Sequence, residues 1–221
     1  MFEQMKKNTV DSSNQLKKNE YVYVQNPKGK GKRVMFAGNS ITLHGVKEDI
    51  GWMNRWGMAA SALEKDYVHI LMNKISEKYD DAVFCICQVA EWERKYKNGE
   101  TTYDLYREAR DFSADIIIAR FVENCPLDGF DADAFRKEYP KFLDYLNASE
   151  KLITTGGFWK HPADEIISQV AKERGYAYVE LGDLGERDDM RATGLFEHAG
   201  VAAHPGDKGM AHIAERIWQV F

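Results

Sequence analysis

Five short apolar segments alternate with helix-length amphipathic segments along most of this chain, and no other feature constrains the fold as strongly. The apolar segments lie near residues 33–38, 82–88, 115–120, 151–156 and 176–181. Some are apolar without interruption, as in Ile116-Ile-Ile-Ala119, which is typical of strands covered on both faces. The alternation predicts a three-layer α/β/α sandwich with a five-stranded parallel sheet.

The segments between these strands predict the helices that cover the sheet. They span about 58–79, 101–112, 131–147, 163–174 and 207–219. Asp131 is expected to cap the third helix, Gly175 to end the fourth in a left-handed conformation, and Asp207 to cap the last. No repeat or linker interrupts residues 33–221, so we expect one domain there.

Residues 1–32 are polar and rich in lysine, which predicts an N-terminal arm. Within the arm, Tyr21-Val-Tyr-Val24 alternates and could add a short extra strand. The first residues lack the apolar core of a signal peptide, and no stretch of about 18 apolar residues follows, so we expect a cytoplasmic protein with no membrane partner. A net charge of −5 provides no basic field for nucleic acid. The sequence leaves the oligomeric state open.

The three cysteines are expected to be buried apolar residues rather than a disulfide framework. Cys85 and Cys87 are two residues apart and would share one face of a strand, while Cys125 stands alone. No second pair of cysteine or histidine residues accompanies them at ligand spacing, so no metal site is predicted.

Two short motifs could carry chemistry. Ser40 follows the first predicted strand directly, at the sheet edge where open α/β sheets bind ligands, and His204 precedes the last helix. A serine and a histidine are the minimum parts of a serine hydrolase, in which the imidazole removes the hydroxyl proton and the oxygen attacks a carbonyl. The alternatives are a helix-capping serine and a structural histidine.

The residues around both positions match a known family. Gly38-Asn-Ser-Ile-Thr42 resembles the first block of the SGNH (GDSL) hydrolases, and His204-Pro-Gly-Asp-Lys-Gly-Met210 resembles their last block. The resemblance runs from about Arg33 to the end of the chain. It implies a serine esterase with Ser40 as nucleophile and His204 as general base, which needs neither a metal nor an organic cofactor.

The same resemblance implies an oxyanion hole built from three donors. These are the backbone N–H groups of Ser40 and Gly57 and the side-chain amide of Asn124, with Gly51 as the second choice for the glycine. The third block departs from the family pattern, because Val122 replaces its glycine and Cys125 its aspartate. The alternatives are an ordinary turn glycine and a loop asparagine bonded to its own backbone.

The acid of the triad is missing from its usual place. The family carries an aspartate three residues before the histidine, where this chain has Val201. Glu197 or Asp183 could reach His204 from another backbone position. A backbone carbonyl could orient the ring instead, giving a Ser-His dyad like that of some carbohydrate esterases with this fold. The third possibility is an impaired enzyme.

Aromatic residues near the predicted sheet edge suggest a sugar platform, although ordinary packing would also explain them. They are Trp52, Trp56, Trp92, Phe158 and Trp159. Arg120 and Glu123 could bind hydroxyl groups beside Trp159. We therefore expect a small-molecule substrate, a short-chain and preferably acetyl ester of a carbohydrate.

Other functions remain compatible with these residues. Lysophospholipase or thioesterase activity needs the same nucleophile and base, and the missing acid also allows a non-catalytic ligand-binding module. A flavodoxin-like phosphate-binding protein is not supported, because no glycine-rich loop follows the first strand.

Overall fold

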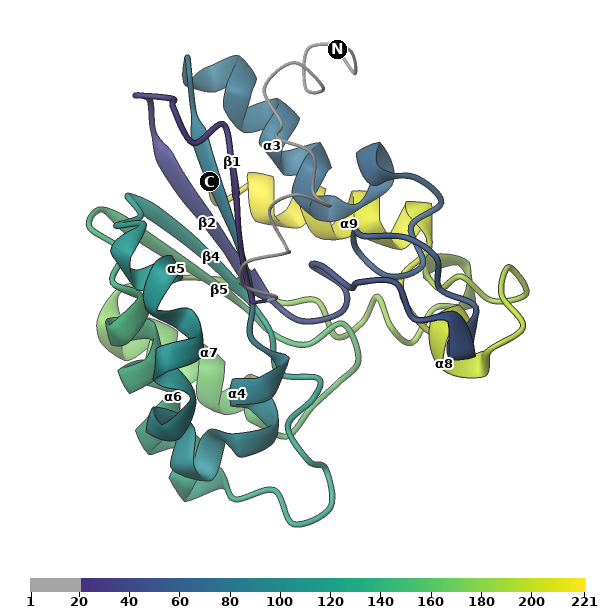
Figure 1. Cartoon of the computed structure of the whole chain (residues 1–221). Helices are drawn as coiled ribbons and strands as arrows, with labels where there is room; N and C mark the ends of the chain where they lie inside the picture. Colours follow the sequence, from purple (N-terminus) through teal and green to yellow (C-terminus); the bar gives the residue numbers. More distant parts are fainter. Residues whose placement is uncertain (1–20) are drawn as a thin grey trace.

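The computed structural model describes residues 21–221, which form a central sheet with helices on both faces (Figure 1). The six strands are β1 (Val22–Gln25), β2 (Arg33–Gly38), β3 (Val83–Gln88), β4 (Ile116–Arg120), β5 (Lys151–Thr155) and β6 (Ala177–Val179), in the order β1-β3-β2-β4-β5-β6. The five predicted strands are all present and pair in parallel.

The prediction of a five-stranded sheet is one strand short. The possible extra strand in the N-terminal arm exists as β1 and pairs antiparallel with β3, with Val22 opposite Cys87. The arm predicted over 1–32 therefore contributes one edge strand, and its first 20 residues lie outside the described part of the chain.

Most predicted helices are present with shifted boundaries. The helical segments are η1 (Glu48–Ile50), η2 (Leu63–Lys65), α3 (Tyr67–Lys78), α4 (Ala90–Lys95), η3 (Tyr96–Tyr106), α5 (Arg107–Asp111), α6 (Ala132–Leu146), α7 (Ala163–Arg174), η4 (Asp188–Met190), α8 (Ala199–Ala202) and α9 (Asp207–Trp218). The helix predicted from residue 58 starts only at Tyr67, because the Asp66 side chain accepts from the His69 N–H and caps it there.

Two of the three predicted caps are confirmed. The Asp131 carboxylate accepts from the Ala134 N–H, and Gly175 ends α7 with φ of 70°. The prediction for Asp207 is wrong: Gly206 is the N-cap residue of α9, and the Asp207 carboxylate accepts instead from the N–H and hydroxyl of Ser61.

The strands divide their side chains between two cores, as expected for a doubly covered sheet. Along β2, Val34 and Phe36 pack on the side of α3 and α9, whereas Met35 and Ala37 pack on the side of α4 to α7. Figure 1 shows these helices as separate layers on the two faces of the sheet. The three cysteines are buried and free, as predicted.

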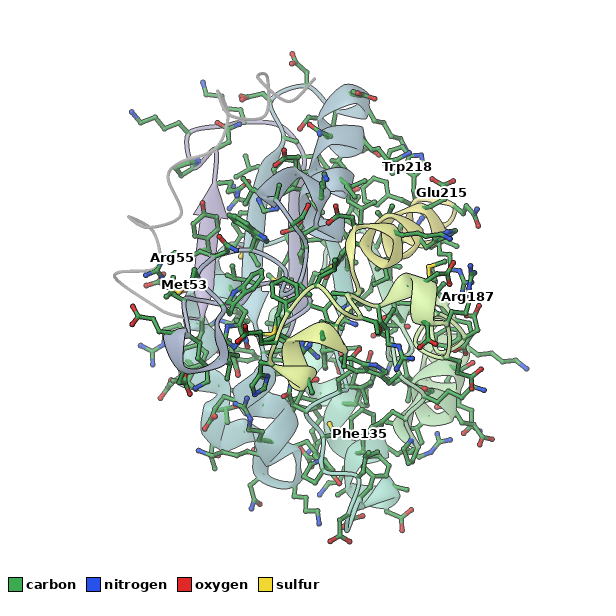
Figure 2. The ribbon with its side chains drawn as sticks, turned by 90° about the vertical axis from the view of Figure 1, so that its right-hand side faces the viewer. Met53, Arg55, Phe135, Arg187, Glu215 and Trp218 are labelled. Carbon is green, nitrogen blue, oxygen red and sulfur yellow. The ribbon has the colours of Figure 1, made fainter. Side chains whose placement is uncertain are left out.

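A third, small apolar cluster joins two segments that are far apart in the sequence. Its fully buried members are Trp52, Met58, Ala59, Ala192 and Val201. The cluster packs the segment between β2 and α3 against the segment that leads into α9. The first of these segments also exposes Met53 and Arg55 at the surface (Figure 2). Within residues 21–221, no helix is long and apolar enough to cross a membrane.

Candidate active site

Ser40 and His204 meet at the carboxyl edge of the sheet, although 163 residues lie between them in the sequence. The Ser40 Oγ lies 2.8 Å from the His204 Nε2. A turn and an extended segment follow Ser40, so this serine does not cap a helix. The turn is tight: a Cβ at Gly38 would lie 1.8 Å from the Thr42 Oγ1, so only glycine fits where β2 delivers the serine.

A backbone carbonyl orients the imidazole of His204. The Nδ1 of His204 lies 2.6 Å from the Gly200 oxygen in the short helix α8. Because a carbonyl can only accept, Nδ1 carries the hydrogen and Nε2 offers its lone pair to the Ser40 hydroxyl. Burial lowers the pKa of His204 to about 4, against the opposing effect of the Gly200 hydrogen bond. The ring is therefore neutral at neutral pH.

Neither carboxylate predicted as a possible acid lies at this imidazole. Asp183 forms a two-point ion pair with Arg216, which holds the pKa of that carboxyl below its usual range. Glu197 is exposed and lines a separate hollow. Val201 is fully buried in the third apolar cluster. Of the three possibilities that the sequence left open, the arrangement fits the carbonyl-oriented dyad.

The predicted oxyanion donors differ in whether their N–H groups already donate to another acceptor. Among the described residues, no hydrogen bond uses the Ser40 N–H. Gly57 does not fit its predicted role, because its N–H donates to the Asp66 carboxylate at 3.0 Å. Gly51 is exposed in a left-handed turn after η1. The Asn124 amide donates to the Glu93 carboxylate at 2.7 Å and keeps a second N–H.

A buried polar network lies next to Ser40. Arg120 is fully buried and forms a two-point pair with Glu123, at 2.6 and 3.1 Å. Both contact Asn39, which precedes Ser40: the Arg120 guanidinium donates to its Oδ1, and its Nδ2 donates to Glu123. Glu123 also accepts from the N–H of Phe158. Burial alone would raise the pKa of Glu123, but Arg120 and these donors hold it below its usual value.

The prediction that Arg120 and Glu123 bind substrate hydroxyls does not fit this arrangement. Their side chains are only 0% and 6% exposed and satisfy each other. They tie together the loops that follow β2, β4 and β5. Their role is therefore structural support for the site rather than contact with a ligand.

Sequence reasoning missed Glu93, which completes this network. It is fully buried on α4 and accepts from the Asn39 Nδ2 at 2.9 Å, as well as from Asn124. Burial and the nearby charge of Glu123 raise the pKa of Glu93 to about 7. The signal available in the sequence was position alone, since Glu93 follows the carboxyl end of β3, at the same edge as Ser40.

Most of the predicted aromatic platform is core. Trp52, Trp92 and Phe158 are fully buried. Trp159 is half-buried, and its ring stands edge-on to the His204 imidazole, with 5.3 Å between centroids. Trp56 is also half-buried and contacts Trp52. Trp159 is therefore the aromatic residue placed beside the dyad.

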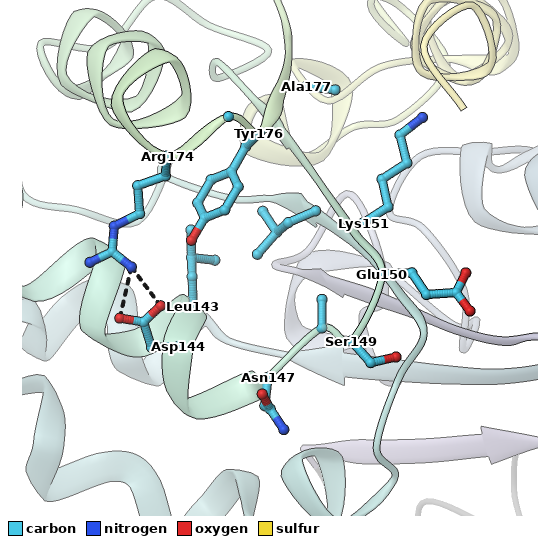
Figure 3. A pocket seen from close by; sticks show the side chains of 12 residues that line it. Leu143, Asp144, Asn147, Ser149, Glu150, Lys151, Arg174, Tyr176 and Ala177 are labelled. Carbon is cyan, nitrogen blue, oxygen red and sulfur yellow. Dashed lines mark hydrogen bonds and ion pairs between the residues drawn. The ribbon is translucent and has the colours of Figure 1, made fainter.

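Two surface hollows lie away from the dyad residues. One, of about 590 Å³, separates the η1 turn from residues 195–198. The other, of about 580 Å³, lies at the opposite edge of the sheet, where β5 and β6 begin (Figure 3). Its charged residues include Arg174 and Asp144, which pair with each other at 2.7 Å. Neither hollow places a serine or cysteine beside a histidine. In the described part of the chain, no cluster of three or more His, Cys, Asp or Glu residues could hold a metal.

Comparison with known proteins places the fold. No protein-family model matches the chain, and no curated protein matches it. Solved structures do, each with a TM-score of 0.50: a two-domain esterase active on acetylated mannans (13% identity over 85% of this chain), a family two carbohydrate esterase from Cellvibrio japonicus (13% over 87%), and a lipolytic G-D-S-L family protein from Veillonella parvula (16% over 86%).

The chain spans 47% and 60% of the first two of these proteins and 98% of the third. It therefore has the α/β/α fold of the SGNH (GDSL) esterases, as its sequence motifs predicted. At such identities the likeness establishes the fold, and the chemistry depends on the residues at the site.

Proposed function

We propose that this protein is a serine esterase that hydrolyses a short-chain ester, preferably an acetyl ester on a carbohydrate, through a dyad of Ser40 and His204. The 2.8 Å contact between Oγ and Nε2, with Nδ1 on the Gly200 carbonyl, is the observation that carries this proposal. It supplies a nucleophile, a neutral base and a fixed tautomer, which are the parts that acyl transfer needs.

The reaction has two halves. In the first, the Ser40 Oγ attacks the ester carbonyl carbon while the His204 Nε2 takes the hydroxyl proton. The carbonyl oxygen becomes an oxyanion, which the Ser40 N–H and the Asn124 amide stabilise. The intermediate then breaks its carbon–oxygen bond to the alcohol, and the imidazolium protonates the departing oxygen. An acyl ester on Ser40 remains.

In the second half, His204 removes a proton from water, and the oxygen of that water attacks the acyl carbon. The second oxyanion collapses, the bond to the Ser40 Oγ breaks, and the imidazolium returns the proton to that oxygen. The carboxylic acid leaves. The Gly200 carbonyl keeps Nδ1–H in place throughout and its dipole stabilises the imidazolium, a task that a carboxylate performs in a triad.

The substrate class is supported by two observations. Trp159 stands beside His204 with part of its ring accessible, which suits the apolar face of a sugar. Two of the similar structures are described as a carbohydrate esterase and as an esterase active on acetylated mannans. The same dyad could serve a lysophospholipase or a thioesterase, so the test includes these substrates.

Intact-mass labelling with a fluorophosphonate tests the chemistry first. We expect one adduct on the wild type, none on Ser40→Ala, and an unchanged adduct on Ser61→Ala, whose hydroxyl contacts the Asp207 carboxylate at the surface. A panel of 4-nitrophenyl acetate, 4-nitrophenyl octanoate, an acyl thioester and acetylated oligosaccharides then ranks the substrates. A folded wild type that takes no label would contradict the esterase and favour a non-catalytic ligand-binding module.

A further inference from the structure

Glu93 makes contacts that the hydrolytic steps above leave unexplained. Its carboxylate is fully buried and, within residues 21–221, no cation bonds to it, yet it accepts three hydrogen bonds. The Oε1 accepts from the Asn39 Nδ2 at 2.9 Å and from the Asn124 N–H at 3.3 Å, and the Oε2 accepts from the Asn124 Nδ2 at 2.7 Å. Asn124 is thus held at both its backbone and its side chain by one carboxylate.

The orientation of Asn124 matters because an amide can turn either end toward a neighbour. A carboxylate only accepts, so it selects the nitrogen end of the Asn124 amide and excludes the oxygen end. An amide nitrogen carries two hydrogens, and Glu93 uses one of them. Because the Gly57 N–H is engaged by Asp66, the Ser40 N–H and the Asn124 amide are the predicted oxyanion donors that remain.

We propose that Glu93 is a positioning residue of the esterase: its carboxylate fixes the Asn124 amide with the second N–H presented to the oxyanion that forms at Ser40. This inference rests on the proposed function. It assigns to Glu93 no contact with substrate, only the orientation of the group that makes that contact.

The surroundings of Glu93 make this orientation sensitive to pH. The charged and titratable groups around it are Glu123 and Arg120 from the β4 side and the Cys125 thiol. Burial and the charge of Glu123 raise the pKa of Glu93 to about 7, because Arg120 is already paired with Glu123. When Glu93 is protonated, its new O–H group faces an N–H donor, and the carboxyl group no longer selects the nitrogen end of the Asn124 amide.

A double-mutant cycle tests the proposal. Glu93→Gln keeps the shape of the side chain but places an NH₂ group where one of the donors must bond. With 4-nitrophenyl acetate at pH 8, we expect kcat to fall on the order of 10- to 100-fold, with KM changed less than about threefold. Asn124→Ala should cost on the order of 100-fold or more. In the Asn124→Ala background, Glu93→Gln should cost nothing further.

Glu91→Gln is the matched control on the same helix. The Glu91 carboxylate pairs with Lys95 at 2.6 Å near the surface and contacts none of the network, so kcat should stay unchanged. Thermal unfolding of each variant shows whether the fold is retained. Additive losses in the double mutant, or an unchanged kcat in Glu93→Gln, would overturn the positioning role.

The pH dependence of kcat provides a second test, which compares the wild type with Glu93→Gln. The wild-type kcat should rise with pH through a step near 7, and Glu93→Gln should lack that step. A step of the same size in Glu93→Gln would overturn the proposal, because the pH dependence would then belong to another group. Fluorophosphonate labelling distinguishes failure of this inference from failure of the proposed function. If Ser40 is labelled but kcat does not respond to Glu93→Gln, only the positioning role is refuted. If Ser40 is not labelled, the esterase proposal is refuted as well.

Discussion

Restoring the missing acid should damage this protein rather than improve it. Val201 occupies the position where the SGNH family carries the triad aspartate, and Val201→Asp would place a carboxylate there. The Val201 side chain is fully buried against Trp52, Met58, Ala59 and Ala192, and none of these side chains offers a hydrogen-bond donor to a carboxylate at this position. The Nδ1 of the neighbouring histidine already donates to the Gly200 carbonyl.

The magnitude follows from two costs. Losing the buried isopropyl group removes about 1.5–3 kcal/mol of hydrophobic stabilisation. The aspartate has an ordinary pKa near 3.9 and must be neutral to stay buried. Keeping it protonated costs about 1.4 kcal/mol for each pH unit above that pKa, or roughly 4 kcal/mol at pH 7. For a chain of 221 residues, the combined loss of about 5.5–7 kcal/mol lowers the Tm by roughly 11–28 °C.

Differential scanning calorimetry and the hydrolysis of 4-nitrophenyl acetate measure the two consequences. Val201→Ala is the control for lost packing and should cost about 2 kcal/mol, well short of the aspartate variant. We expect no gain in kcat for Val201→Asp. An aspartate variant as stable as Val201→Ala and faster than the wild type would refute the reasoning, since it would mean that this position reaches the imidazole.

Three more outcomes follow from the same contacts. Glu197→Ala and Asp183→Ala, alone or together, should leave kcat within about twofold of the wild type, because neither carboxylate touches the dyad; a collapse in either would identify a relocated acid. In a Glu93→Gln background, where only the dyad titrates, kcat/KM should fall by less than about a tenth when the pH is lowered from 7.5 to 5.5, because the pKa of His204 is lowered to about 4. If His204 had an ordinary pKa, kcat/KM would fall about tenfold over the same range. Arg120→Met should lower the free energy of unfolding by about 3–5 kcal/mol, measured with urea, because it leaves a buried carboxylate without its cation; a loss below about 1 kcal/mol would contradict that pairing.

The sequence by itself determined the fold class and the two ends of the site. Strands that are apolar without interruption must be covered on both faces, and alternating helices can do this only in a layered parallel sheet. The carboxyl ends of such strands share one edge, so Ser40 after the first strand had to lie near groups that follow the others. The edge strand β1 was harder to predict, because four alternating residues in a polar arm carry little signal.

The tertiary structure decided which groups serve the dyad. The partner of the His204 Nδ1 is a backbone carbonyl, and every residue has one, so no residue type marks Gly200 in the sequence. Gly57 looked like an oxyanion donor until Asp66, nine positions along, proved to hold its N–H. Arg120 and Glu123 looked like ligand-binding groups because their charge is visible in the sequence and their burial is not.

Burial and hydrogen bonding depend on which segments meet, and here the segments that meet are far apart in the chain. Glu93 becomes significant only because the loops after β2 and β4 bring Asn39 and Asn124 to it. Local residue patterns therefore fix the layers and the position of Ser40, whereas the partner of the His204 Nδ1 and the contacts of Gly57 and Asn124 are properties of long-range packing.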